Sequence, residues 1–252
     1  MSCLLNVERK DPVSNRIMFL NIYRGREFDE SFQRYIDSRF QGSPEVVVRS
    51  FDEELRSSQP SYLHQLGPHR YESLTLPDTL RMIVESESDG FDAAVIGCYC
   101  DPALIEAREV ADRLVITAPA EASMLLATTM GQRFSTLVPT RELVSPMALT
   151  VTSYGLNEKC ASLRPIGMGV HELQKDPQAT LACLEQVGRQ AIKEDYADVI
   201  ILGCTDFFGM HAELQSILGR PVIDCVLASV AFADFLADAK KNLGYGYMSV
   251  TA

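Results

Sequence analysis

Two short apolar segments of the sequence each end in a Gly-Cys pair. Gly97-Cys98 closes the run AAVIGC, and Gly203-Cys204 closes the run DVIILGC in the second half of the chain. Each run is typical of a buried strand, and each cysteine is followed by what looks like the start of a helix. Unpaired backbone N–H groups and the helix dipole favour an anion there, so the pKa of the thiol would be lowered. A cysteine in this position is a useful base at neutral pH.

Two such cysteines that face each other across a cleft would form a two-base device. One thiolate would remove a proton from a carbon next to a carbonyl group, and the opposite thiol would deliver a proton to the other face. Backbone N–H groups at the helix starts would hold the developing enolate oxygen. The pattern therefore predicts Cys98 and Cys204 as catalytic residues that invert a carbon centre, with no cofactor required.

Both cysteines also have a plainer interpretation, because cysteine is among the most buried residue types and often only packs at the end of a strand. Cys100 is an alternative to Cys98, but only Cys98 repeats the Gly-Cys pair. The remaining cysteines lack this context and are predicted to be structural: Cys3, Cys160, Cys183 and Cys225.

Other kinds of site have weaker support. Two sets of residues could be imagined as metal ligands: Cys98, Cys100 and Asp101, or Cys204, Asp206 and His211. Neither spacing matches a usual metal motif, so no metal is predicted. The histidines are expected at the surface: His64, His69, His171 and His211. A hydrolase with a Cys–His pair remains an alternative, although the sequence contains no motif of that kind of enzyme. Nucleotide binding has no support, because no Walker A or G-x-G-x-x-G sequence occurs.

The elements that must position the cysteines alternate between strand and helix, which predicts parallel α/β sheets. Strands are expected over 16–22, 45–51, 93–98, 113–117, 133–140, 160–166, 198–204 and 220–224. Helices are expected over 28–40, 76–91, 103–112, 120–131, 142–155, 179–196, 210–218 and 226–241, with Pro146 a possible break. The segment 52–71 has no clear period and is predicted to be a loop. Sites in such sheets form at the carboxyl ends of strands, where both cysteines lie.

The repeated unit of strand, Gly-Cys and helix predicts two pseudo-symmetric lobes, each with a mainly parallel sheet flanked by helices. We expect the first lobe over residues 1–112 and the second over 113–224. The C-terminal helix within 225–252 is expected to pack back on the first lobe.

Composition narrows the possible partners. The 252 residues carry a formal net charge of −11, which argues against a nucleic-acid partner. No apolar run approaches the roughly 20 residues of a membrane helix, and the N-terminus lacks a signal peptide. The seven cysteines are odd in number and spread along the chain, unlike a disulfide framework. A cytoplasmic protein with reduced thiols and no membrane partner is predicted.

Several stretches, in order and at these spacings, carry a resemblance that spans most of the chain. They are LGPHRYES (66–73), GFDAAVIGCYCDPAL (90–104), RFSTLVPT (133–140), YGLNEKCASLR (154–164) and DVIILGC (198–204). Together they resemble the hydantoin and allantoin racemase branch of the Asp/Glu racemase superfamily.

The resemblance implies two pseudo-symmetric α/β lobes with the site between them. It implies a cofactor-independent racemase of a 5-substituted hydantoin or of allantoin, a small-molecule substrate, with Cys98 and Cys204 as acid and base. It also implies a homo-oligomer. The family's substrate-binding positions fall on Asn21, Tyr99, Thr140 and Thr205.

The chain departs from the family pattern in two places. The first strand of the family usually ends in Asn-Pro-Asn-Thr, whereas this chain has NIYRG, so that Tyr23 and Arg24 are predicted to meet the substrate. Arg24 would suit a more polar or anionic substrate, or could instead point to solvent. After Cys204, two additional aromatic residues, Phe207 and Phe208, either line an apolar pocket or pack the fold.

Competing functions remain open at this point. Besides the racemase, one alternative is related enolate or cysteine-adduct chemistry: an arylmalonate-type decarboxylase, which needs one cysteine, a maleate isomerase-like enzyme or an amino-acid racemase. The other alternative is a non-catalytic small-molecule-binding protein with the same fold. Two strand-end cysteines favour inversion, because inversion needs an acid on each face of the carbon.

Overall fold

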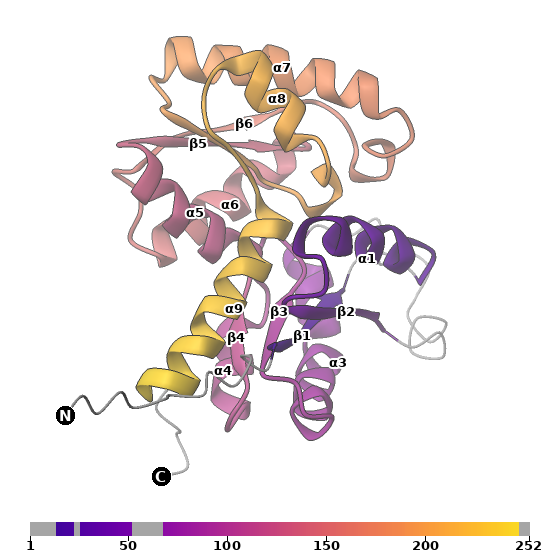
Figure 1. Ribbon diagram of the computed structural model, residues 1–252. Coiled ribbons are helices and arrows are strands. Elements are labelled where there is room, and N and C mark those ends of the chain that lie inside the picture. Colours follow the sequence, from indigo (N-terminus) through magenta and orange to yellow (C-terminus); the bar gives the residue numbers. More distant parts are fainter. Residues whose placement is uncertain (1–13, 23–25, 52–67, 247–252) are drawn as a thin grey trace, which may run out of the picture.

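Two four-stranded parallel sheets organise the chain in a computed structural model that describes residues 14–22, 26–51 and 68–246 (Figure 1). The strand order is β2-β1-β3-β4 in the first sheet and β6-β5-β7-β8 in the second, the same order with each number raised by four. All six strand pairings are parallel. The predicted fold class, two similar parallel α/β lobes, is therefore confirmed.

The inner strands are short apolar runs, as sheets covered on both faces require, whereas the edge strands β2 and β6 are only partly buried. In the first sheet they are β1 (Arg16–Asn21), β2 (Glu45–Ser50), β3 (Ala93–Ile96) and β4 (Val115–Thr117). In the second they are β5 (Phe134–Val138), β6 (Cys160–Pro165), β7 (Val199–Leu202) and β8 (Val222–Asp224). All four residues of β3 and of β7 are buried. These two central strands lead directly to the predicted cysteines.

Helices cover the faces of both sheets (Figure 1). Those of the first half are α1 (Arg26–Phe40), α3 (Pro68–Ser88) and α4 (Leu104–Val110). Those that follow are α5 (Pro119–Met130), α6 (Val144–Ser153), α7 (Pro177–Glu194), α8 (His211–Leu218) and α9 (Cys225–Leu243). Single 3-10 turns lie at η2 (Arg141–Leu143), η3 (Val170–Glu172) and η4 (Thr205–Phe207).

One hydrophobic cluster belongs to both sheets. It contains Phe19 of β1 and Phe134 of β5, together with Met124 of α5 and Val230 of α9, all at most 1% exposed. The long helix α9 starts beside the second sheet and runs down along the first (Figure 1). Because burial of such side chains contributes about 1.5–3 kcal/mol each, this shared core joins the lobes firmly.

Each sheet also has an outer cluster of its own. Met18 and Ile96 of the first sheet pack with Ile83 of α3 and Leu104 of α4. In the second sheet, apolar residues of β5, β7 and β8 pack with α7 and α8: Leu137, Ile200, Leu202, Val222, Leu184 and Leu214. The two outer layers therefore repeat the same plan around the shared core.

Two features differ from the sequence-based expectations. Helix α3 begins at Pro68 with Pro77 inside it, so the end of the predicted loop 52–71 is helical, while residues 52–67 lie outside the described residues. Pro146 does not break α6, because it is the third residue of the helix, where its missing N–H would have no partner within the helix.

The division of the chain at residues 112 and 113 stays a prediction. By sheet membership, β4 goes with the first lobe, since Ala93, Ala94 and Val95 of β3 pair with it. Helix α9 contacts β1, β3 and β4, where the C-terminal helix was expected to return. None of the helices in the described ranges combines the length and apolar character that crossing a membrane requires.

Candidate functional site

The two Gly-Cys pairs occupy equivalent places at the carboxyl ends of the central strands. Cys98 follows the end of β3 by two residues, and Cys204 follows the end of β7 by two residues. The N–H of Gly97 donates to the carbonyl of Leu20 at 2.8 Å, and the N–H of Gly203 donates to the carbonyl of Leu137 at 2.8 Å. The matching bonds show that the two cysteines leave their sheets in the same way.

Glycine is required at both positions by the neighbouring strand. A Cβ atom on Gly97 would lie 2.7 Å from the carbonyl oxygen of Leu20, and one on Gly203 would lie 2.4 Å from Cγ2 of Thr136. Contacts this short do not occur between real side chains, so a larger residue would force the strands apart. The structural reason for the glycines is therefore close approach between strands.

The backbone after each cysteine differs from the expected helix start. Cys98 enters a tight turn in which the N–H of Asp101 donates to the Cys98 carbonyl at 3.0 Å, and α4 begins only at Leu104. Cys204 precedes the single 3-10 turn η4. The expectation that each cysteine lies at a helix N-terminus is wrong for Cys98, because Asp101 and Ala103 adopt left-handed conformations that delay the helix.

A third cysteine is buried at the start of the C-terminal helix. Cys225 is the first residue of α9 and 1% exposed. Burial raises the pKa of its thiol well above the ordinary value, and the nearby charges of Asp224, Cys204 and Asp101 add to the effect. Both Cys98 and Cys204 are half-buried.

Asp101 has a buried carboxylate with a full set of partners. It accepts hydrogen bonds from the N–H groups of Ala120 at 2.8 Å and Glu121 at 2.7 Å, and from the hydroxyl of Tyr154 at 2.6 Å. Burial raises its pKa to about 7, against the lowering effect of these hydrogen bonds. The sequence analysis considered Asp101 only as a metal ligand. The signal that could have identified it is helix α5, whose own N-cap position holds Ala118, a residue with no side-chain acceptor.

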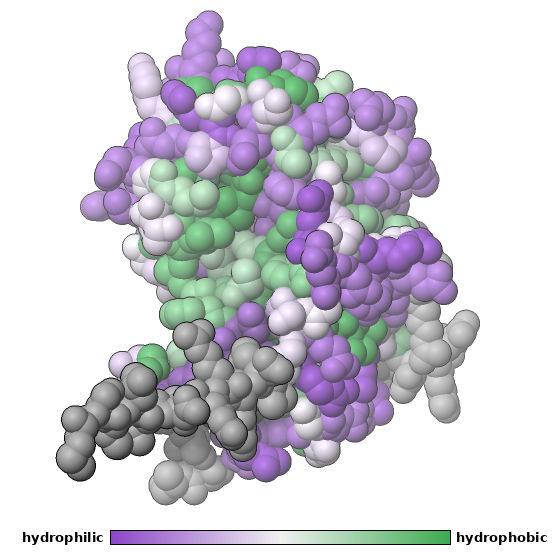
Figure 2. Space-filling view, viewed as in Figure 1, coloured by the Kyte–Doolittle hydropathy of each residue, from purple (hydrophilic) through white to green (hydrophobic). Residues whose placement is uncertain are grey.

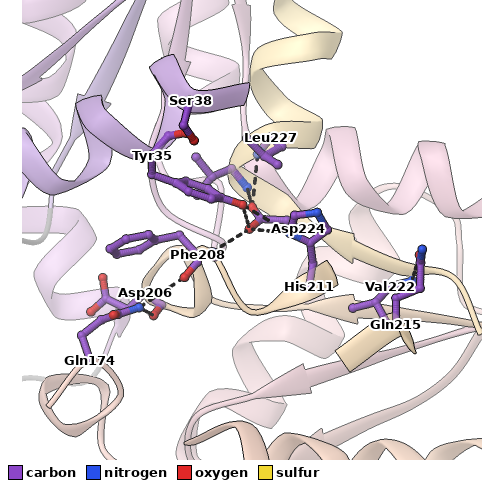
Figure 3. Close-up of polar contacts among 12 residues, drawn as sticks. Tyr35, Ser38, Gln174, Asp206, Phe208, His211, Gln215, Val222, Asp224 and Leu227 are labelled. Carbon is purple, nitrogen blue, oxygen red and sulfur yellow. Dashed lines mark hydrogen bonds and ion pairs between the residues drawn. The ribbon is translucent and has the colours of Figure 1, made fainter. Parts of the chain in front are cut away.

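A second buried carboxylate joins the lobes on the other side (Figure 3). Asp224, 5% exposed, accepts a hydrogen bond from the hydroxyl of Tyr35 on α1 at 2.7 Å. His211 Nδ1 lies 3.3 Å from the Tyr35 oxygen and 3.7 Å from the Asp224 carboxylate. Burial lowers the pKa of His211, although the Asp224 charge opposes this. His211 is thus half-buried, which corrects the expectation that it lies at the surface; His171 is exposed as expected.

The segment after Cys204 is held on both sides. Phe208 packs on the rings of Phe32 and Tyr35, with centroid separations of 4.8 Å and 5.4 Å. From the second lobe, the Gln174 side-chain amide donates to the carbonyl of Asp206 at 2.7 Å (Figure 3). The preceding Phe207 is 0% exposed and belongs to the outer cluster of the second lobe. Both aromatic residues therefore pack the fold.

The structure places the other expected site residues at or near strand ends. Asn21 ends β1, is buried, and its amide donates to Asp29 at 2.8 Å and to Ser50 at 3.3 Å. Thr140 follows β5 and is half-buried. Thr205 is buried in η4.

Tyr99 leaves the first lobe and enters the second. Its ring is 3% exposed, and its hydroxyl lies 3.4 Å from Thr136 Oγ1 on β5. Tyr23 and Arg24, also expected to meet the substrate, lie outside the described residues. Within the described part of the chain, no group of three or more His, Cys, Asp or Glu side chains could hold a metal ion.

Comparisons with known proteins agree with this arrangement. The family model Asp/Glu/Hydantoin racemase matches residues 51–233. The chain is 37% identical over 183 residues to a hydantoin racemase of Pseudomonas sp. (strain NS671), which covers 71% of this chain and 73% of the relative. It is 36% identical over 176 residues to a hydantoin racemase of Rhizobium meliloti, with 70% of each chain covered.

A solved structure extends the similarity to nearly the whole fold. The structure of an allantoin racemase from Klebsiella pneumoniae aligns with a TM-score of 0.77 at 25% sequence identity, covering 93% of this chain and 91% of that one. The family match, the curated relatives and the doubled sheet with its paired cysteines lead to the same conclusion. The chain belongs to the Asp/Glu/hydantoin racemase family.

Proposed function

We propose that the protein is a cofactor-independent racemase that inverts the acidic carbon of a 5-substituted hydantoin or an allantoin-like cyclic amide. Cys98 and Cys204 are the two catalytic residues. The relatives carry the racemase assignment, since the curated ones are hydantoin racemases and a similar solved structure is an allantoin racemase.

In the proposed reaction, the thiolate of one cysteine takes the proton from the carbon between the ring carbonyl and the ring nitrogen. The electron pair of the broken C–H bond moves into the carbonyl and forms an enolate. The thiol of the other cysteine then gives its proton to the opposite face of the carbon, and the electron pair returns to form the new C–H bond. The two cysteines exchange protonation states in each turnover, and no oxidant or reductant is needed.

The observation that carries this proposal is the equivalence of the two Gly-Cys pairs. Each cysteine lies two residues beyond the central strand of its sheet, after a glycine bound to the neighbouring strand. A two-sided proton transfer needs this kind of doubled placement, whereas a one-cysteine reaction does not.

Substrate contacts are proposed for residues beside the same strand ends. Asn21 is the last residue of β1, Thr140 lies two residues beyond the equivalent strand β5, and Thr205 follows Cys204 directly. Tyr99 contributes its backbone and the first carbon atoms of its side chain in this proposal, because its hydroxyl is turned toward Thr136. Tyr23 and Arg24 remain proposed contacts that select the substituent of the ring.

The test is a racemisation screen with both enantiomers of allantoin and of 5-alkyl and 5-aryl hydantoins, followed by circular dichroism. Cys98→Ser and Cys204→Ser should each abolish racemisation, because serine is a far weaker acid and base at neutral pH. Cys183→Ser, in α7 and away from the strand ends, is the matched control and should retain full activity. Full racemisation by either site variant would contradict the two-cysteine proposal.

The screen also separates the competing functions. An arylmalonate-type decarboxylase would release carbon dioxide from a disubstituted malonate and would require only one of the two cysteines. A non-catalytic binding protein would bind a hydantoin in calorimetry without turnover of any compound. Loss of optical activity from a hydantoin or from allantoin, with no release of carbon dioxide from a malonate, supports the racemase proposal.

Self-association is proposed as well. Figure 2 shows apolar side chains gathered over α5 and α6 and toward α9. Exposed members of this apolar face are Leu125, Leu126, Met130, Leu149 and Phe235. Apolar faces of this kind often mark contacts between subunits. Light scattering should report a homo-oligomer, and a monomer at all concentrations would contradict this. A cytoplasmic location stays a prediction.

A further inference from the structure

The two buried carboxylates occupy equivalent places in the repeated fold. Helix α5 follows the last strand of the first sheet, and α9 follows the last strand of the second. Asp101 accepts the N–H groups of the second and third residues of α5, Ala120 and Glu121. Asp224 likewise accepts those of the second and third residues of α9, Val226 at 2.9 Å and Leu227 at 3.2 Å. Each carboxylate therefore caps the matching helix of its half.

Each of these carboxylates also receives a tyrosine hydroxyl from the opposite lobe. Tyr35 lies on α1, which follows β1, and donates to Asp224 at 2.7 Å. Tyr154 is the C-cap residue of α6, which follows β5, and its hydroxyl donates to Asp101 at 2.6 Å. The two tyrosines come from equivalent helices and cross between the lobes in opposite directions. Hydrogen bonds to a carboxylate are stronger than hydrogen bonds between neutral groups, so these two contacts contribute more to the stability of the lobe interface.

Each pair is tied to one cysteine. The backbone N–H of Asp101 donates to the carbonyl of Cys98 and closes the turn that holds this thiol. On the other side, Asp224 accepts the N–H of Gly209, in the segment after Cys204, at 3.4 Å. Its partner Tyr35 packs on the ring of Phe208 in the same segment, with a centroid separation of 5.4 Å.

We infer that the two tyrosine–aspartate pairs are the positioning residues of the proposed two-base site, with Tyr154–Asp101 setting Cys98 and Tyr35–Asp224 setting Cys204. The inference rests on the proposed function and deepens it. The loop of each cysteine is linked through an aspartate to a hydroxyl from the opposite lobe. The contacts that join the lobes therefore also fix the two cysteine loops relative to each other. Proton transfer from both faces of one carbon depends on that relative position.

The tyrosines are suited to this role because they keep their protons. Burial raises the pKa of Tyr35, and the charge of Asp224 raises it further. Burial and the charge of Asp101 do the same for Tyr154. Both hydroxyls therefore remain donors throughout the pH range of ordinary assays, and removal of one hydroxyl leaves a buried carboxylate short of one hydrogen bond.

The test compares two variants that remove the same atom from opposite sides, Tyr35→Phe and Tyr154→Phe. Tyr196→Phe, at a side chain that is 76% exposed, is the matched control. Alkylation of Cys98 and Cys204 by iodoacetamide is followed by peptide mass spectrometry in the folded protein, with thermal unfolding checked in parallel. Tyr35→Phe should raise the alkylation rate of Cys204 relative to Cys98 by about threefold or more, and Tyr154→Phe should shift the ratio the opposite way.

Kinetics provide the second readout. Each variant should lower kcat by about tenfold or more with little change in KM, because the substrate still binds while the thiols are misplaced. If the substitutions only loosened the fold, the alkylation rates of Cys98 and Cys204 would instead change together. Equal rate changes at Cys98 and Cys204 in both variants, or an unchanged ratio, would overturn the inference.

The two proposals fail in distinguishable ways. If the wild-type protein racemises nothing in the substrate screen, the proposed function fails, and the alkylation ratio still tests whether the pairs hold the cysteines. If the wild-type protein racemises a hydantoin and the ratio stays constant, only the positioning inference fails. Should a phenylalanine variant not fold, Asp224→Asn, which keeps the shape of the side chain, takes the place of Tyr35→Phe, and Asp101→Asn takes the place of Tyr154→Phe.

Discussion

Gly97 and Gly203 each lie where a methyl group would overlap the neighbouring strand. They let β3 approach β1 and β7 approach β5 at the carboxyl ends of these strands. The Gly-Cys pattern correctly indicated two equivalent strand ends, while the catalytic role of the two cysteines stays a prediction. The buried partners Asp101 and Asp224 could not be identified in this way, since their contacts join residues far apart in the chain.

Substitution of these glycines should therefore destabilise the fold. Gly203→Ala places a Cβ atom 2.4 Å from Thr136 Cγ2 and 2.8 Å from the Leu137 carbonyl oxygen. We expect a loss of about 1–3 kcal/mol in the free energy of unfolding, measured by urea denaturation. Gly246→Ala is the control, because the nearest atom to its Cβ is Lys240 Cε at 3.6 Å. If the Gly203→Ala variant were as stable as the wild type, the explanation that glycine is needed for the contact between strands would be contradicted.

Asp101 makes stability depend on pH. Burial raises its pKa from 3.8 to about 7 in the folded protein, so the folded state binds a proton there that the unfolded state releases. The stability from this group is present below pH 3.8 and is lost as the pH rises through about 7.

Relative to Asp101→Asn, the wild-type free energy of unfolding should fall by up to about 1.4 kcal/mol per pH unit across that window. Urea denaturation at several pH values between 4 and 8 would measure it, with other titrating groups common to both proteins cancelling. Parallel pH profiles for the two proteins would show that Asp101 titrates at its ordinary value.

At the scale of elements, the alternation of apolar runs with helical patterns was sufficient to predict the eight strands in the described part of the chain. The predicted ends differ from the observed ones by no more than two residues. Parallel strands buried on both faces give a strong local signal of this kind. The helix starts were less predictable. The turn after Cys98 depends on left-handed residues, Asp101 and Ala103, and α5 is capped from a distant loop. Local propensity carries no information about either feature.

Phe208 joins α1 to the loop after Cys204, and its truncation tests that contact. Phe208→Ala removes a ring that lies 4.8 Å from the Phe32 ring and 5.4 Å from the Tyr35 ring. We expect a loss of about 1–2 kcal/mol in the free energy of unfolding, less than a fully buried phenylalanine would give, since this side chain is half-buried. Phe208→Leu should recover part of the loss. No change in either variant would mean that this ring contact contributes nothing.

At the scale of the whole molecule, the fold is one α/β unit used twice around a shared core. The doubled Gly-Cys motif predicted this architecture, and the family model and the relatives agree with it. What the sequence could not provide is the relation between the halves, because crossing contacts such as Tyr35–Asp224 and Tyr154–Asp101 leave no periodic pattern. In the proposed mechanism, such contacts fix the relative position of the two thiols.

The apolar face on α5, α6 and α9 belongs to the same scale. Leu126→Glu and Phe235→Glu each place a charge on this face, at side chains that are 41% and 63% exposed. If subunits meet there, both variants should dissociate to monomers in sedimentation experiments while remaining folded. Leu74→Glu, on α3 and 52% exposed, is the control and should keep the wild-type assembly. Unchanged assembly in both α5 and α9 variants would move the interface elsewhere.

The most direct test of the central claim is the fate of the proton at the reacting carbon. A single enantiomer of a racemised substrate is incubated with the wild-type protein in D2O, and both enantiomers are separated and analysed by mass spectrometry at low conversion. With Cys98 and Cys204 on opposite faces, the product enantiomer should carry deuterium while the remaining substrate stays almost free of it. Equal deuterium in both enantiomers from the earliest times would indicate a single base and would contradict the two-cysteine account.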